Sequence, residues 1–216
     1  YVKVRQADHT LYLSKGTLHN LEGDYEVLEE LPGAALEGWT YDGPFDELEA
    51  QQAAGGPAAH RVILWDEVGE AEGTGIVHIA PGCGAEDFQL GQEYDLPTLA
   101  PLSEEGYFLE GFGSLTGAQV SESAEQIFES LREKGIMYKV EDYTHRYPVC
   151  WRCSTELVFR LVDEWFISMD ELRYRMMEVT KLIRWIPSFG LERELDWLRN
   201  MHDWMISKKR YWGLAL

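Results

Sequence analysis

The stretch GTGIVHIAPGCGAEDF, residues 73–88, decides how the chain is interpreted. Its four glycines allow positive φ angles and close approach of a ligand to the backbone. His78 is the one polar side chain in the apolar run Ile76–Ala80, for which we predict a strand, and Asp87 follows beyond a glycine-rich turn. An imidazole and a carboxylate brought together at a strand end can orient a water molecule or bind an ammonium group. A hydrogen-bonded core histidine and glycines that serve only turns are the alternative interpretation.

A second candidate site is the pair Cys150 and Cys153 in the sequence CWRC. Two thiolates at this spacing can supply half of a tetrahedral zinc site, and Cys83 and His145 are possible further ligands. A redox pair instead favours a first cysteine at a helix N-terminus. Zinc is therefore the favoured hypothesis, because the residues that follow the pair predict a strand, and two buried small side chains are the alternative.

The remaining patterns predict an α+β fold with a β-rich first part and a mostly helical end. We expect strands at residues 2–4, 11–13, 61–65, 76–80 and 157–159, and a surface loop at 51–59. Helices are expected from Ser123 to Lys134 with Gly135 as the C′ residue, from a capping box at Ser168–Glu171 up to Pro187, and over residues 191–201.

Charge and composition exclude several classes of protein. Residues 1–140 carry 26 acidic and 7 basic side chains, whereas residues 141–216 carry 12 of each. The first part therefore disfavours extensive contact with duplex nucleic acid, although Lys208–Arg210 is locally basic. No run of 18 apolar residues is present, so no membrane segment is expected. Three cysteines cannot form a closed disulfide framework, which indicates a reducing compartment, the cytoplasm.

The segment at residues 73–88 resembles the editing-site motif of class I isoleucyl-tRNA synthetases. The valyl and leucyl relatives share the GTG, the proline and the later aspartate, but usually not the histidine at position 78. Further matches follow in the family's order: Leu99–Pro101 with Gly106, HRYPVCWRCSTELVFR at 145–160, EWFI at 164–167 and DWMISKKRYWG at 203–213.

This resemblance implies a β-rich editing domain inserted into a Rossmann-like synthetase core. Residues 1–143 would be the C-terminal portion of the editing domain, whose threonine-rich strand lies upstream of Tyr1. Residues 144–216 would form a zinc-ribbon-like CxxC turn and helices that return to the catalytic core. We therefore expect the chain to be part of a longer, monomeric protein.

The resemblance also implies hydrolysis of valyl-tRNA(Ile), because a missing methylene gives too little discrimination in a single binding step. Asp87 would hold the α-ammonium group of the aminoacyl ester. His78 would line the small side-chain pocket, help to exclude isoleucine and help to place the water. The residues expected around the terminal adenosine of the tRNA 3′ CCA end are Gly73, Thr74, Gly75, Gly82 and Gly84.

Some expectations concern cofactors and departures from the family's pattern. Cys150 and Cys153 would be half of a four-cysteine zinc site. ATP and Mg²⁺ belong to the intact enzyme, because this chain has no HIGH-type or KMSKS-type motif. Cys83 and Glu86 replace a histidine and an aspartate common in the bacterial motif. The alternatives are a non-catalytic tRNA-binding or scaffold part of a class I synthetase, with a valyl-type relative possible, and a zinc-ribbon redox protein.

Overall fold

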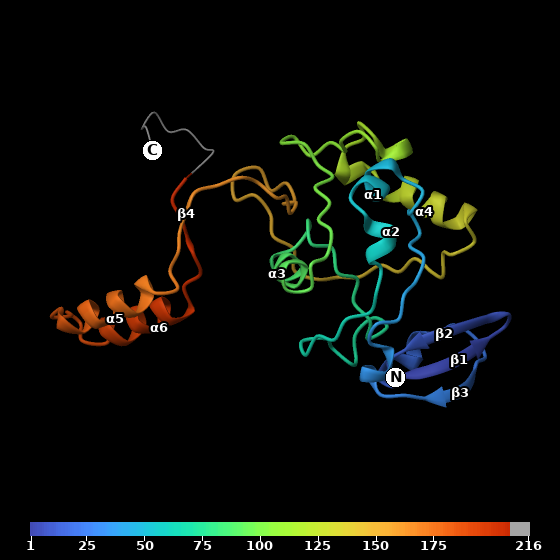
Figure 1. The fold of residues 1–216 in the computed structure, drawn as a ribbon, viewed down its shortest axis with the longest axis horizontal. Helices are drawn as coiled ribbons and strands as arrows, with labels where there is room; N and C mark the ends of the chain where they lie inside the picture. Colours follow the sequence, from blue (N-terminus) through green and yellow to red (C-terminus); the bar gives the residue numbers. More distant parts are fainter. Residues whose placement is uncertain (208–216) are drawn as a thin grey trace. The chain divides into compact units, whose positions relative to one another are not determined.

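The structure, a computed structural model, describes residues 1–207 and has two compact units, Tyr1–Leu161 and the part that begins at Val162 (Figure 1). Both helices and small antiparallel sheets are present, which confirms the expected mixture of α and β structure. The domain boundary between residues 143 and 144 stays a prediction. The basic run Lys208–Arg210 lies outside the described residues. No helix within residues 1–207 has the length and apolar character needed to cross a bilayer.

A three-stranded antiparallel sheet forms the best-buried part of the first unit. Strand β1 (Val2–Gln6) lies between β2 (His9–Leu13) and β3 (Glu26–Glu30). Val2 pairs with Leu13 in the register, and Val2, Val4 and Leu13 are all buried. Alternation of apolar and polar residues places these side chains on one face of the sheet, as the period-2 pattern predicts. The strands expected at residues 2–4 and 11–13 are therefore confirmed.

Short helices and turns connect the rest of the first unit. They are η1 (Lys15–Asn20), η2 (Gly33–Leu36), α1 (Glu49–Ala53), α2 (Gly56–Ala59), α3 (Ala85–Glu93), η3 (Gly113–Leu115), η4 (Val120–Glu122) and α4 (Ala124–Glu133). The expected loop at residues 51–59 is wrong, since α1 and α2 occupy most of it. Its alanines and glutamines have good helix propensity, and Gly55, with φ of +77°, divides the two helices.

Helix α4 confirms the prediction for residues 123–134. Ser123 is its N-cap residue, and Gly135 follows the helix with φ of +69°. The Ser123 hydroxyl donates to the carbonyl of Val120 and does not cap the helix with its oxygen. The helix boundaries were therefore predicted correctly, although the capping hydrogen bond was not.

Three expected strands are wrong. In residues 61–65 only Arg61 makes a bridge, to Thr40, and residues 76–80 and 157–159 are not in strands. An apolar or alternating pattern favours an extended backbone, but a strand also needs a partner at the right register. Among residues 1–207, the pairing of residues 61–65 is limited to this one bridge and two hydrogen bonds of Val62 with Gly38 and Trp39, and residues 76–80 pair with no strand.

The second unit contains a helical pair and a short two-stranded sheet. Helices α5 (Leu172–Leu182) and α6 (Gly190–Asn200) lie against each other, and β4 (Phe166–Ile167) pairs with β5 (Trp204–Met205). The helix expected at residues 191–201 is confirmed. The expected helix from Ser168 to Pro187 is too long at both ends, because α5 begins at Leu172 and ends at Leu182.

The late start of α5 has a tertiary cause. The backbone N–H of Met169 donates to Oδ1 of Asp203 at 2.9 Å, and the Met169 side chain is fully buried. The apolar burial and this hydrogen bond hold residue 169 outside the helix, so tertiary packing outweighs the local capping pattern.

Candidate functional site

The GTG turn at residues 73–75 is attached to the N-terminal sheet through three consecutive carbonyl groups. Asn20 Nδ2 donates to the Gly73 carbonyl at 2.6 Å, the Ser14 N–H to the Thr74 carbonyl at 2.7 Å, and the Tyr1 hydroxyl to the Gly75 carbonyl at 2.6 Å. We call Tyr1, Ser14 and Asn20 the carbonyl clamp. The GTG turn is therefore fixed by residues that are 53 to 74 positions away in the sequence.

The glycine at position 75 is required by this attachment. A Cβ atom at Gly75 would lie 2.4 Å from the Cβ of Ser14, which is closer than any two real side chains approach. A Cβ atom at Gly73 would meet nothing within 4 Å. The Thr74 hydroxyl accepts from the Ile76 N–H at 3.3 Å and therefore fixes the direction in which the chain leaves the turn.

The segment Ile76–Ile79 runs from the clamp to a second attachment at Ala80. The Ala80 N–H donates to Oδ1 of Asp87 at 2.8 Å. Ile76, Val77 and His78 are exposed, and within residues 1–207 the backbone of residues 77–79 makes no hydrogen bond. His78 is therefore displayed on an extended segment that is held at its two ends.

The second attachment ties Asp87 to a backbone position two residues from His78. His78 lies two residues before Ala80, so their backbones are within about 7 Å of each other. Asp87 is half-buried, and its Oδ2 accepts no hydrogen bond from the described residues. The structure therefore leaves one carboxylate oxygen of Asp87 free for a cationic group close to the segment that carries His78.

The glycines on the far side of Ala80 have contacts within the protein. A Cβ atom at Gly82 would lie 1.6 Å from the carbonyl oxygen of Leu99, so this position admits no side chain. Gly84 is the N-cap residue of α3, and a Cβ atom there would meet Oδ2 of Asp87 at 2.2 Å. These glycines let the Leu99 backbone and the Asp87 carboxylate approach the turn.

Cys83 lies in the turn between Ala80 and α3. Desolvation of the sulfur by surrounding protein atoms, and then the nearby Asp87 carboxylate, raise the pKa of the Cys83 thiol. A thiol that stays protonated is a poor nucleophile at neutral pH. Cys83 is therefore a poor candidate for a nucleophile at neutral pH.

Cys150 and Cys153 lie on one tight turn. The Cys150 N–H donates to the Thr155 carbonyl and the Ser154 N–H to the Cys150 carbonyl, both at 2.8 Å. Val149 and Glu156 form a bridge that closes the turn. The turn expected here is therefore present, and both thiols are free.

The cysteine turn can supply two of the four ligands that a tetrahedral zinc site needs. A hydrogen bond with the Thr155 hydroxyl, helped by the Thr155 backbone and by Cys150, lowers the pKa of Cys153 to about 7. A thiolate is the form that binds zinc. Within residues 1–207, no three His, Cys, Asp or Glu side chains are grouped to hold a metal ion. Neither Cys83 nor His145 completes the site, and the His145 ring packs instead against Tyr143 and Tyr147.

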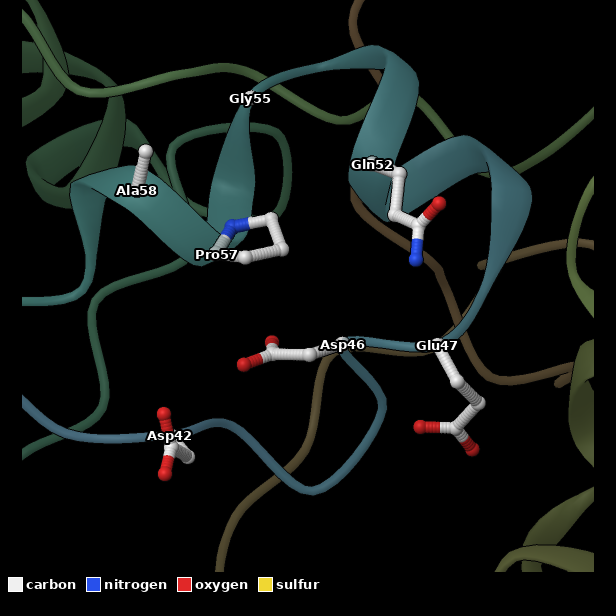
Figure 2. Close-up of a pocket in the computed structure, with 7 residues that line it drawn as sticks. All are labelled: Asp42, Asp46, Glu47, Gln52, Gly55, Pro57 and Ala58. Atoms are coloured by element: carbon white, nitrogen blue, oxygen red, sulfur yellow. The ribbon is translucent and has the colours of Figure 1, made fainter.

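An acidic pocket of about 570 Å³ lies beside α1 and α2 (Figure 2). Its lining residues are Asp42, Asp46, Glu47, Gln52, Gly55, Pro57 and Ala58. The Asp46 carboxylate is 2.7 Å from His60 Nε2 and accepts from the Gly43 N–H at 2.7 Å. Desolvation opposes the ionisation of Asp46, but the bonds from His60 and Gly43 outweigh it and lower its pKa.

Sequence patterns missed this pocket. The His60 ring stacks on Tyr41 with centroids 4.9 Å apart. Its contacts with Asp46 and Tyr41 support a structural role. The Asp46–His60 spacing of 14 residues matches no helix or strand period, so no local signal predicted the pair.

A comparison with known protein families identifies the class to which this chain belongs. The family described as "tRNA synthetases class I (I, L, M and V)" matches residues 14–216. The chain therefore belongs to the class I tRNA synthetase family.

Similar proteins identify the branch of the family. An isoleucine–tRNA ligase of Methanothermobacter marburgensis is 37% identical over 218 residues, which cover 100% of this chain and 21% of that protein. Isoleucine–tRNA ligases of Methanopyrus kandleri and Pyrococcus abyssi are 39% and 42% identical over 94% and 88% of this chain, and over 19% and 18% of their own lengths. These relatives confirm the resemblance to isoleucyl-tRNA synthetases, and the chain spans about a fifth of their length.

Proposed function

We propose that the chain is the editing part of an isoleucine–tRNA ligase and that residues 73–88 form the site that hydrolyses valyl-tRNA(Ile). The observation that carries the proposal is the hydrogen bond from the Ala80 N–H to Asp87 Oδ1, because it brings a partly free carboxylate next to the exposed segment that contains His78. The isoleucine–tRNA ligases among its relatives support the choice of amino acid and tRNA.

Asp87 binds the substrate in this account. The α-ammonium group of an aminoacyl ester is a cation, and Oδ2 of Asp87 can accept a charge-assisted hydrogen bond from it. Oδ1 keeps its bond to Ala80 and holds the carboxylate in place. The ester is therefore positioned by its ammonium group, beside the extended segment.

His78 provides selection and helps to place the water. Its exposed ring reduces the space for the amino-acid side chain, which admits valine and rejects the larger isoleucine. The water oxygen adds to the ester carbonyl carbon, the bond from that carbon to the ribose oxygen breaks, and the ribose oxygen takes a proton. No covalent intermediate is needed, in keeping with the raised pKa of Cys83.

The acidic surface is compatible with this substrate. Residues 1–140 carry 26 acidic side chains, which repel a duplex, but only the single-stranded CCA end of tRNA(Ile) has to reach the site. Gly73 and Thr74 are exposed and face the terminal adenosine in this account, whereas Gly75 and Gly82 are buried against Ser14 and Leu99, and Gly84 lies against Asp87. The protein acts in the cytoplasm as a monomer, and the rest of the synthetase chain supplies the ATP and Mg²⁺ sites.

Cys150 and Cys153 are proposed as two of four zinc ligands. Their shared turn and the low pKa of Cys153 support the assignment. Bound zinc would fix this turn to the segment that carries the other two cysteines. The remaining ligands lie outside the described residues.

The experiment that tests the proposal compares two substrates in the full-length synthetase. We expect Asp87→Ala to lower the hydrolysis of valyl-tRNA(Ile) by about 100-fold, because a charge-assisted contact with the substrate is lost, while isoleucylation changes little. We expect His78→Ala to begin hydrolysing isoleucyl-tRNA(Ile). Equal loss of editing and aminoacylation in the Asp87 variant would instead indicate a purely structural carboxylate.

A second candidate function is a scaffold that binds tRNA without catalysis. The observation that favours it is the exposed segment Ile76–His78, whose backbone finds no partner strand within residues 1–207. Valyl-tRNA(Ile) hydrolysis by this chain beside a version extended upstream by the threonine-rich strand distinguishes the two. Activity only in the extended version would support the scaffold interpretation of the shorter chain.

A further inference from the structure

The carbonyl clamp takes no direct part in the proposed hydrolysis, yet its hydrogen bonds are short. Its three members reach three successive carbonyl oxygens at 2.6 to 2.7 Å. Turns on a protein surface usually leave such carbonyls to water. Full occupation of three neighbouring acceptors by distant residues indicates that the position of this turn matters.

The clamp controls one end of the segment that carries His78. The other end is the Ala80 N–H, which Asp87 holds. Between the Gly75 carbonyl and the Ala80 N–H, the backbone of residues 77–79 has no hydrogen bond within the described chain. The position of His78 therefore depends on two attachments, of which the clamp is one and Asp87 the other.

Each attachment serves a different part of the proposed site. Asp87 binds the ammonium group and holds Ala80 directly. Within residues 1–207 no hydrogen bond joins the clamp to His78, so the clamp acts by placing the turn from which the segment begins. We propose that Asn20 and Tyr1 are positioning residues that set the selection between valyl and isoleucyl esters by fixing the segment of His78. This inference rests on the proposed editing function.

The test uses substitutions that keep the shape of the side chain and remove one hydrogen-bond donor of the clamp. Asn20→Asp replaces the donating amide by a carboxylate that cannot donate to the Gly73 carbonyl, and Tyr1→Phe removes the hydroxyl that reaches Gly75. In the full-length synthetase we expect each change to lower the ratio of valyl-tRNA(Ile) to isoleucyl-tRNA(Ile) hydrolysis by about tenfold, because small displacements in a site have large effects. Isoleucylation stays at the parental rate.

Gln6 offers a matched control. Its Nε2 donates to the Glu22 carbonyl at 2.6 Å, from strand β1 and away from the GTG turn. Gln6→Glu removes that donor in the same way as Asn20→Asp removes its own. We expect this control to leave the selection ratio unchanged, and an equal loss in the control would overturn the inference.

A double-substitution cycle separates positioning from general destabilisation. If Asn20 acts through His78, Asn20→Asp changes the selection ratio in the parent but not in the His78→Ala background. Equal effects in the two backgrounds, or no effect of Asn20→Asp in the parent, would refute the inference. If Asp87→Ala retains hydrolysis of valyl-tRNA(Ile), the proposed function itself fails. If Asp87→Ala loses this hydrolysis and Asn20→Asp leaves the selection ratio unchanged, only the inference about the clamp is refuted.

Discussion

The GTG turn and the cysteine turn are both short motifs, but different kinds of hydrogen bond hold them. Residues far away in the sequence hold the GTG turn, and neighbouring residues hold the cysteine turn. The GTG turn is fixed by side chains and backbone from residues 1–20, across separations of up to 74 residues. Around Cys150 every hydrogen bond described above joins residues a few positions apart, and Trp151 in the turn is 78% exposed. The first is a tertiary structure and the second a local one.

This difference shows what each motif needs in order to function. The cysteine turn presents two thiols by itself, and the proposed zinc site would need further ligands from elsewhere. The glycine-rich segment has both of its attachments inside the first unit, so its geometry depends on the sheet and on α3. Changes in the glycine-rich segment should therefore propagate, whereas changes in the cysteine turn should stay local.

The largest expected effect comes from close packing around the glycine-rich segment. Gly82→Ala places a Cβ atom 1.6 Å from the Leu99 carbonyl oxygen, and we expect it to lower the free energy of unfolding by about 3 kcal/mol. Gly73→Ala meets no atom within 4 Å and suffers only from its φ of +56°, so about 1 kcal/mol is expected. Urea unfolding of both variants beside the parent measures the difference. Equal losses would show that contact with Leu99 is unimportant.

The sequence predicted the elements whose signals lie within a few neighbouring residues, and it missed those that depend on tertiary contacts. Strands β1 and β2, helices α4 and α6 and the turn at Cys150 were predicted, because their signals lie within a few residues. Helices α1 and α2 were missed, because glycine and proline in the stretch GGP suggested a loop. The start of α5 was predicted too early, since the burial of Met169 is a tertiary effect.

The motif nominates His78 and Asp87 as site residues, but it does not predict the contacts that hold them in place. The residues at positions 78 and 87 were chosen from a motif, and the structure brings Asp87 to the segment of His78. The strand expected at residues 76–80 is instead an extended segment without a partner in the described chain. No pattern pointed to Tyr1, Ser14 or Asn20, because hydrogen bonds to carbonyls 53 or more residues away leave no periodic signal.

A smaller effect is expected in the reactivity of the two classes of thiol. Thiolates react and thiols do not, so a cysteine reacts faster as the pH rises through its pKa. With a pKa of about 7, Cys153 is about half ionised at neutral pH, while the raised pKa of Cys83 keeps that thiol protonated. In metal-free protein at pH 7 we expect iodoacetamide to modify Cys153 about tenfold faster than Cys83.

The same experiment tests whether the reactivity of Cys153 depends only on its neighbours in the cysteine turn. Thr155→Val removes the hydroxyl that lies 3.2 Å from the Cys153 sulfur, and should raise the pKa of Cys153 and slow its alkylation at pH 7. Cys83 serves as the internal reference and should react unchanged. A change in the rate at Cys83 would contradict the local description. Peptide mapping by mass spectrometry as a function of pH gives both rates.

The most direct test of the account concerns the two oxygens of Asp87. Asp87→Asn keeps an oxygen that can accept from the Ala80 N–H, but removes the negative charge that would pair with the ammonium group of the ester. The measurement is hydrolysis of valyl-tRNA(Ile) by the full-length synthetase, with the free energy of unfolding measured alongside. The account predicts unchanged stability and a loss of hydrolysis of about 100-fold. Hydrolysis at the parental rate by the Asp87→Asn variant would contradict it, because the carboxylate would then serve only to hold the turn.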